Sequence, residues 1–252
     1  MTTLLLDVGN SHLKWGVCFG DAIADTGRCS LQDLQRQGAA NLETYLPEGI
    51  DAAIACNVAG GAVASMLDDF MHSTFGSRIE FVKSSAAAGG VTNAYQDPER
   101  LGVDRWVAMI GARAATTAAC LVVDAGTAIT IDAIDEHGQH LGGQILPGFT
   151  LMAATLNGNT SDLPSIEADQ WSAASFEPAL ANSTEEAIAQ GIMGAILGSV
   201  ERAVQSLQED FAEAIVLLTG GDGGLIHGHL QHAAELRPNL VLEGLACLAK
   251  SD

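Results

Sequence analysis

The amino-acid sequence predicts an α/β protein built from two related halves. Strand-like and helix-like segments alternate along the chain, and an apolar strand followed by an Asp-x-Gly turn occurs twice. Of the 252 residues, 48% are hydrophobic and 17% are charged, which is typical of a globular protein and excludes a disordered one.

The first half is expected to open with three antiparallel strands and to continue as alternating strands and helices. Short apolar runs separated by turn residues indicate the strands, while apolar residues at helical spacing and a capping serine or proline indicate the helices. The expected strands are 3–9, 13–19, 22–29, 50–58 and 78–83, and the expected helices are 30–37, 61–75 and 98–116.

The second half restates the first. Strands are expected within 118–135, at 141–148 and at 212–221, with helices at 149–157, 183–208 and 222–236 and an apolar closing segment at 239–250. The run DVGNS at 7–11 resembles DAGTA at 124–128, which indicates a duplicated domain. We therefore expect two lobes, residues 1–115 and 116–252.

The charge balance restricts the partners. With 31 acidic and 11 basic residues the formal net charge is −20, which repels nucleic acid and anionic membranes. An anion site must therefore be built locally, from backbone amides, a cation and scarce bases such as Lys14, Arg100 and Arg105. Without a long apolar run or a leader-like N-terminus, a cytoplasmic protein is expected. The five scattered cysteines indicate neither disulfides nor zinc.

The run at 7–11 is the first candidate anion site. Gly9 permits a tight turn whose following amides point outward, and Lys14 can reach the same phosphate. Alone, the pattern is more typical of an ordinary hairpin turn. The second copy at 124–128 strengthens it, because two facing turns can hold a polyphosphate and its metal.

Two further glycine-containing runs follow. TGGD at 219–222 is expected to end a strand and begin a helix, so its backbone can approach a nucleotide closely. An isolated TGG, however, is usually an ordinary loop without a ligand. Its place after both turns suggests the adenosine side. The run GGQILPG at 142–148 is interpreted as structural.

The segment 95–106 places an acid and a base side by side early in a helix. An exposed ion pair and cap is the ordinary interpretation of Asp104 and Arg105. Gly102 and Trp106 favour a ligand site instead, since glycine permits close approach and bases are scarce in this chain.

Six runs, in order, resemble the motifs of the type III pantothenate kinase family, and the likeness extends from Leu5 to about Leu245. They are DVGNSHLK at 7–14, GVDRW at 102–106, DAGTAITID at 124–132, GGQILPG at 142–148, NSTEEAIAQG at 182–191 and TGGD at 219–222. The resemblance implies two actin-like (ribonuclease H-like) lobes with a nucleotide cleft between them. It further implies transfer of the ATP γ-phosphate to the 4′-hydroxyl of pantothenate, the first step of coenzyme A biosynthesis.

The resemblance also assigns residues. Asp104 would be the proton acceptor, Asp124 would bind a monovalent cation (K⁺ or NH₄⁺), and Asp7 would lie near Mg²⁺. ATP would contact Asp7, Val8, Gly9, Asn10, Ser11, His12, Leu13, Lys14, Thr127, Gly220 and Gly221. Pantothenate would contact Tyr95, Gly102, Val103, Asp104, Arg105 and, from the partner subunit of a homodimer, Thr184.

Two departures and two alternatives remain. His12 has no clear counterpart in the family pattern, and Ser161-Asp162-Leu163-Pro164 differs from the expected Ala-Gln-Leu-Pro. Another actin-like kinase or phosphatase would share both phosphate turns, but its activity would not require the cluster at 95–105. A non-catalytic nucleotide-binding regulator would be expected to lack Asp104.

Overall fold

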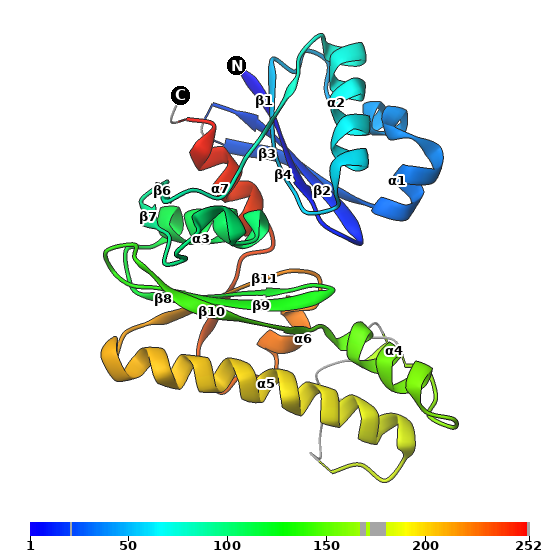
Figure 1. Cartoon of the computed structure of the whole chain (residues 1–252), viewed down its shortest axis with the longest axis vertical. Helices are drawn as coiled ribbons and strands as arrows, with labels where there is room; N and C mark the ends of the chain where they lie inside the picture. The colour runs from blue at the N-terminus through cyan, green and yellow to red at the C-terminus, as the bar shows by residue number, and fades with distance from the viewer. Residues whose placement is uncertain (21, 167–169, 172–179, 251–252) are drawn as a thin grey trace. The chain divides into compact units, whose positions relative to one another are not determined.

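The computed structural model describes residues 1–20, 22–166, 170–171 and 180–250 (Figure 1). The chain divides into two compact units. Unit 1 comprises Met1–Thr116 and Asn239–Asp252, and unit 2 comprises Thr117–Pro238. Each unit contains its own five-stranded mixed sheet.

The sheet of unit 1 has the strand order β3-β2-β1-β4-β5. Its strands are β1 (Thr2–Val8), β2 (His12–Phe19), β3 (Ala22–Ser30), β4 (Ala52–Asn57) and β5 (Ile79–Phe81). The first three form an antiparallel meander, and β4 and β5 continue in parallel with β1. Leu4, Leu5 and Leu6 of the central strand β1 are at most 1% exposed, as expected for a strand covered on both faces.

Helices and short strands complete unit 1. They are α1 (Leu31–Gln37), the 3₁₀ segment η1 (Ala39–Tyr45), α2 (Gly61–Phe75), β6 (Ala87–Ala88), β7 (Val91–Thr92), the 3₁₀ turn η2 (Pro98–Arg100), α3 (Val103–Ala115) and α7 (Leu240–Leu248). Helix α1 begins at the predicted serine cap, because the Ser30 hydroxyl accepts a hydrogen bond from the Asp33 amide.

The closing helix α7 belongs to unit 1, whereas the predicted lobe 116–252 assigned it to the second half. Two glycines explain its place. A Cβ at Gly111 of α3 would lie 2.2 Å from the Leu240 carbonyl oxygen, and one at Gly244 of α7 would lie 2.0 Å from the Val107 carbonyl oxygen. Backbone therefore packs directly on backbone between α3 and α7, which local sequence patterns do not reveal.

Unit 2 repeats the strand arrangement in the order β10-β9-β8-β11-β12. Its strands are β8 (Cys120–Ala125), β9 (Ala128–Ile134), β10 (His140–Pro147), β11 (Ile215–Thr219) and β12 (Ala234–Leu236). The helices are α4 (Phe149–Asn159), α5 (Thr184–Asp210) and α6 (Gly223–His227). Helix α5 runs along one face of the sheet in Figure 1 and buries Ile192, Ile196 and Val200 in the core that contains Leu121 and Ile131.

Two predicted helices were wrong in extent. The helix expected over 98–116 starts only at Val103, because Leu101 and Gly102 have extended ψ angles of 133° and 129° and separate it from η2. The helix expected over 222–236 ends at His227, and Ala234–Leu236 pairs with β11 instead. Within the described residues, no helix is long and apolar enough to cross a membrane.

Candidate functional site

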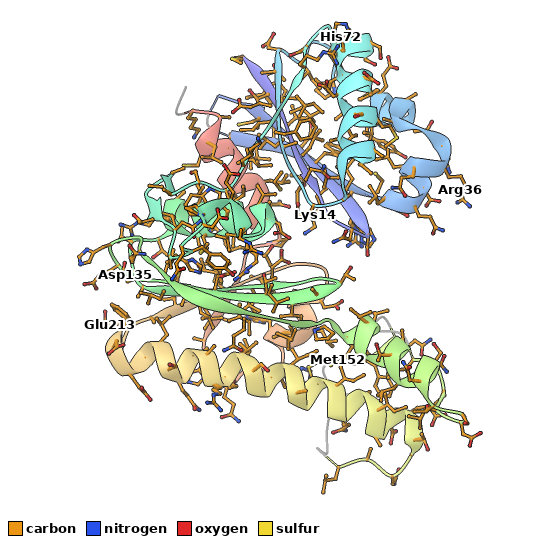
Figure 2. The ribbon with its side chains drawn as sticks, in the orientation of Figure 1. Lys14, Arg36, His72, Asp135, Met152 and Glu213 are labelled. Atoms are coloured by element: carbon orange, nitrogen blue, oxygen red, sulfur yellow. The ribbon has the colours of Figure 1, made fainter. Side chains whose placement is uncertain are left out.

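The first glycine turn joins β1 to β2. Asp7 is the penultimate residue of β1 and pairs with Lys14 of β2 on one side and Cys56 of β4 on the other; Figure 2 labels Lys14. The turn closes through a 3.0 Å hydrogen bond from the Gly9 amide to the His12 carbonyl oxygen. Asn10, Ser11 and His12 are exposed, so the outward part of this turn faces solvent.

The environment of Asp7 disfavours the charged form of its carboxyl group. Burial raises the pKa of its carboxyl group, Lys14 and the Cys56 thiol lower the pKa, and Asp104 raises it further. The Cys56 Sγ donates to Asp7 Oδ1 over 3.4 Å. Burial and the nearby Asp7 and Asp104 carboxylates raise the pKa of that thiol well above its ordinary value, so Cys56 stays protonated and acts as a donor.

Asp104 lies in the first turn of α3, beside Gly102. Its Oδ1 accepts a 2.8 Å hydrogen bond from the Arg105 amide, and a Cβ added to Gly102 would lie only 2.7 Å from the same oxygen. Glycine at 102 therefore makes room for the carboxylate. The Asp104 carboxylate raises the pKa of Asp7, so the predicted phosphate turn and the predicted base belong to one electrostatic cluster within unit 1.

Arg105 does not match the ordinary interpretation of an exposed ion pair. Its side chain belongs to a residue only 6% exposed, and its Nη1 donates to the Tyr95 hydroxyl over 3.1 Å. The Arg105 Cζ also lies 5.9 Å from the centre of the Tyr95 ring. A largely buried cation held by an aromatic hydroxyl is an arrangement suited to an anionic group of a ligand.

The second glycine turn lies in unit 2, between β8 and β9. Its Gly126 amide donates to the Ala128 carbonyl oxygen over 3.2 Å, and Thr127 is exposed. The Gly148 amide donates to the Thr127 carbonyl oxygen over 2.9 Å, and a Cβ at Gly148 would lie 2.2 Å from the Gly126 carbonyl oxygen. The run 142–148, interpreted as structural, thus ends against the second turn and supports its shape.

The TGGD run meets the same turn from the other side. Gly220 has φ +88°, and a Cβ there would lie 2.3 Å from the Ala125 carbonyl oxygen and 2.5 Å from Asp124 Oδ1. The Asp222 amide donates to the Ala125 carbonyl oxygen over 3.0 Å, and burial raises the pKa of the Asp222 carboxyl group. The structure therefore brings Asp124, Thr127, Gly220 and Gly221 together on one side of unit 2.

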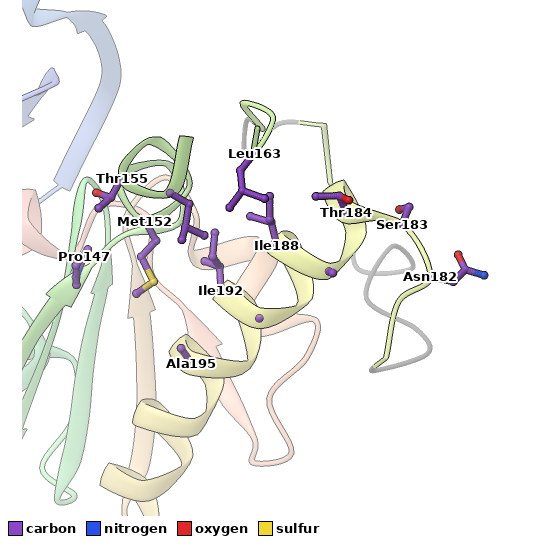
Figure 3. A pocket seen from close by; sticks show the side chains of 13 residues that line it. Pro147, Met152, Thr155, Leu163, Asn182, Ser183, Thr184, Ile188, Ile192 and Ala195 are labelled. Atoms are coloured by element: carbon purple, nitrogen blue, oxygen red, sulfur yellow. The ribbon is translucent and has the colours of Figure 1, made fainter. Parts of the chain in front are cut away.

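Thr184 lies elsewhere in unit 2, as the exposed first residue of α5. It lines a groove of about 790 Å³ between α4 and α5. Figure 3 shows Ile188 and Ile192 of α5 along this groove with Met152 of α4 and Leu163. Thr184, the predicted pantothenate contact, thus lies next to an apolar groove.

The two residues that the resemblance assigns to metal ions, Asp7 and Asp124, carry carboxylate oxygens. Mg²⁺ in phosphoryl-transfer sites usually takes one or two carboxylates together with substrate phosphates, and Asp7 offers a carboxylate next to the first glycine turn. Asp124, which the resemblance assigns to a monovalent cation, offers a carboxylate, and its Oδ1 packs closely against Gly220. The described residues contain no cluster of three or more His, Cys, Asp or Glu able to hold a metal alone.

Sequence reasoning missed two residues of this region. The sequence assigned Cys56 no role. Its position near the end of a buried strand could have placed it beside Asp7, provided that this strand was expected to pair with β1. Asn93 received no role, and its contacts with Tyr95 depend on the path of an irregular loop. A sequence pattern indicates where a strand ends, but it does not indicate the path of an irregular loop.

Comparison with known proteins gives consistent matches. The family described as type III pantothenate kinase matches residues 3–206. A type III pantothenate kinase of Halorhodospira halophila is 41% identical over 250 residues, covering 96% of this chain and 95% of the relative. One of Aromatoleum aromaticum is 37% identical, covering 99% of this chain and 98% of the relative.

Solved structures share the fold at low sequence identity. A candidate 2-dehydro-3-deoxygalactonokinase from Sinorhizobium meliloti has a TM-score of 0.61 at 16% identity, covering 99% of this chain and 96% of the other. The ethanolamine utilization protein EutJ from Carboxydothermus hydrogenoformans has a TM-score of 0.57 at 16% identity, covering 98% and 89%. These likenesses confirm the predicted actin-like α/β fold, and they carry no more than the fold.

Proposed function

The chain belongs to the type III pantothenate kinase family, and on this premise we propose how its residues transfer the ATP γ-phosphate to the 4′-hydroxyl of pantothenate. The product would be 4′-phosphopantothenate, in the first step of coenzyme A biosynthesis. The observation that carries the residue assignment is the electrostatic cluster of Asp7, Lys14 and Asp104, which joins a phosphate turn to a carboxylate at a helix start.

We propose that residues of both glycine turns contact ATP. The exposed amides after Gly9 and the Lys14 ammonium would hold phosphate oxygens, and the exposed Thr127 would contact ATP from the second turn. Gly220 and Gly221 would lie at the adenosine. The open space beside Gly221 permits close approach, whereas Gly220 packs against the second turn. Local donors matter here because the net charge of −20 repels ATP at long range.

Two cations complete this side. Mg²⁺ held near Asp7 would neutralise developing charge on the phosphates, and K⁺ or NH₄⁺ at Asp124 would add positive charge beside them. The raised pKa of Asp7 supports this assignment, because a carboxylate that is costly to bury gains most from a bound cation.

Asp104 would accept the proton of the acceptor hydroxyl. The carboxylate is held by the Arg105 amide over 2.8 Å and has space because residue 102 is glycine. In phosphoryl transfer the protein mainly positions the reactants, and a base is needed only as the new bond to phosphorus forms. The hydroxyl proton would move to Asp104 while the γ-phosphate leaves ADP for the acceptor oxygen.

The acceptor pocket would be formed around Arg105. Pantothenate carries a carboxylate, and the buried Arg105 guanidinium held by Tyr95 is a suitable partner for it. Gly102 and Val103 would complete the wall next to the base. A sugar kinase would have no use for a buried arginine at this point, which favours pantothenate over the rival acceptors.

We extend the proposal to a homodimer in which Thr184 contacts pantothenate bound to the partner subunit. The apolar groove beside Thr184 supports an interface there, because the exposed Leu156 and the half-buried Met152 and Leu163 line it. With its small-molecule substrates and this charge, we propose that the enzyme works in the cytoplasm without nucleic acid or membrane partners.

A coupled assay of ADP release tests the proposed function. The purified chain with Mg²⁺, K⁺ and ATP should release ADP only when pantothenate is added, and replacement of K⁺ by Na⁺ should lower the rate. Release that is independent of pantothenate but stimulated by a sugar would assign the chain to the sugar kinases. No release with any acceptor, together with ATP binding, would favour the regulator.

A further inference from the structure

The loop from Ser84 to Gly102 carries Tyr95 and has little regular structure. Its two ends are joined by a buried 2.8 Å hydrogen bond from the Ser84 hydroxyl to the Leu101 carbonyl oxygen. Between them lie only the two-residue strands β6 and β7 and the turn η2. The position of Tyr95 therefore depends on side-chain hydrogen bonds within the loop.

Asn93 makes those bonds in three directions. Its Oδ1 accepts a 2.9 Å hydrogen bond from the Tyr95 amide, and its Nδ2 donates to the carbonyl oxygens of Ser85 and Pro98, each over 3.2 Å. Its own amide donates to the Ala86 carbonyl oxygen over 2.9 Å. One partly buried side chain thus links the start of the loop to the segment on both sides of Tyr95.

The loop is also fixed to the helix that carries Asp104 and Arg105. Gly89, in the turn between β6 and β7, has φ +54°, and a Cβ there would lie 2.4 Å from the Ile110 side chain of α3. This end of the loop therefore packs directly on α3, and β7 contacts α3 as well. Asn93 directly follows β7, so it transmits that fixed position to Tyr95.

Tyr95 in turn holds Arg105. The tyrosine hydroxyl accepts from the guanidinium over 3.1 Å, and the ring lies within cation–π distance of it. Arginine side chains lose considerable conformational freedom when they are fixed, so a preorganised tyrosine reduces the cost of binding an anionic group.

We propose that Asn93 is a positioning residue for the acceptor pocket, which acts through Tyr95 to orient the Arg105 guanidinium toward the carboxylate of the acceptor. This inference rests on the proposed function, because it requires pantothenate to bind at Tyr95 and Arg105. Asn93 itself would contact neither ATP nor pantothenate, and its substitution would weaken the binding of pantothenate alone.

A double-mutant cycle tests the inference. Asn93→Ala should raise the KM for pantothenate by about 5- to 20-fold, with the KM for ATP and kcat changed less than about threefold. In a Tyr95→Ala background the same substitution should change the KM for pantothenate less than about twofold, because the residue through which Asn93 acts is already gone. Titration of pantothenate with a non-hydrolysable ATP analogue should give the same pattern in Kd.

Matched variants separate positioning from general stability. Asn93→Ser retains a short oxygen that can accept from the Tyr95 amide but loses both Nδ2 donor bonds, so its KM for pantothenate should lie between those of the wild type and Asn93→Ala. If Asn93→Ala does not fold, the cycle is measured with Asn93→Ser, and its smaller rise in KM should likewise disappear in the Tyr95→Ala background. Asn41→Ala removes an exposed 2.8 Å bond to Gln37 in the same unit and should leave pantothenate affinity unchanged.

The outcomes are distinct. Equal fold-changes with and without Tyr95, or a KM for ATP that rises as much as that for pantothenate, would overturn the positioning role while leaving the proposed function intact. A wild-type chain with no pantothenate-dependent turnover would overturn the proposed function and this inference with it.

Discussion

Asp7 illustrates at the scale of a residue how function and stability oppose each other. The carboxylate lies at the end of the central strand, and burial together with Asp104 raises its pKa above the ordinary value of 3.8. A group whose pKa is raised on folding contributes stability that is fully present below its unfolded pKa and is lost as the pH rises through the folded pKa. At neutral pH the ionised Asp7 is therefore a cost to the fold.

Asp7→Asn should consequently raise the free energy of unfolding at pH 7 while lowering kcat by about 10²-fold or more. Asparagine keeps an oxygen that accepts from the Cys56 thiol, so the packing is retained. Urea unfolding measured from pH 4 to pH 8 should show an advantage for the variant that grows with pH. Asp69→Asn, whose side chain is 82% exposed, is the control and should show no such trend. A variant less stable than wild type at pH 7 would contradict this account.

Residue types at the site were predictable, but their environments were not. The adjacency of Asp104 and Arg105 follows from sequence. The position of Asp104 in the first helical turn does not, because the helix was expected to begin at Pro98 and begins at Val103. The burial of Arg105 depends on Tyr95 reaching it from a loop ten residues away, and the thiol beside Asp7 comes from a parallel strand 49 residues away. Local patterns carry no information on such long-range contacts.

At the scale of elements, glycines determine how the segments of unit 2 fit together. Gly220 lies where any side chain would meet the Ala125 carbonyl oxygen at 2.3 Å and Asp124 at 2.5 Å, and its φ of +88° disfavours other residues. Gly221 next to it has no neighbour within 4 Å of an added Cβ. The two glycines of one motif therefore have different physical roles.

Gly220→Ala should lower the free energy of unfolding by at least about 1–3 kcal/mol, through strain at positive φ and the contact with the second turn. Gly221→Ala should change it by less than about 0.5 kcal/mol. Urea unfolding of both variants measures the difference. Equal stability of the two variants would show that the close approach at residue 220 does not constrain the turn.

Strands were easier to predict than helix limits for a physical reason. Buried strands such as β1, β4, β8 and β11 are continuous apolar runs ended by glycine or polar residues, which sequence displays directly. The predicted helix over 222–236 failed because strand β11 takes up 234–236 as a parallel neighbour. That pairing satisfies the backbone hydrogen-bonding groups of both strands, and it outweighs the helical spacing of apolar residues within 222–236.

At the scale of the whole molecule, the two units repeat one strand order, with an antiparallel meander followed by two parallel strands. A likeness of five residues between the two glycine turns was enough to predict this duplication. Thr184 lies in unit 2 beside an apolar groove, whereas Asp104 lies in unit 1. If the acceptor site is shared between subunits, each residue can be supplied by a different chain.

Mixed inactive variants test this sharing. Chains with Asp104→Asn and chains with Thr184→Ala should each have low activity at limiting pantothenate. In an equal mixture after subunit exchange, about one site in four combines an intact Asp104 from one chain with an intact Thr184 from its partner. Mixing should therefore recover up to about a quarter of the wild-type rate. Sedimentation at assay concentration should show a dimer. A fully active monomer would exclude a shared site.

The central claim is that Asp104 accepts the proton of the acceptor hydroxyl. The most direct measurement is kcat for Asp104→Asn beside a nucleotide-binding titration of the same protein, with Asp69→Asn as the control. The substituted amide keeps the size of the side chain but is a far weaker base, so kcat should fall by roughly 10²–10⁴ while the Kd for ATP changes less than about twofold. A kcat within about threefold of wild type would contradict the claim and leave positioning of the phosphates as the source of catalysis.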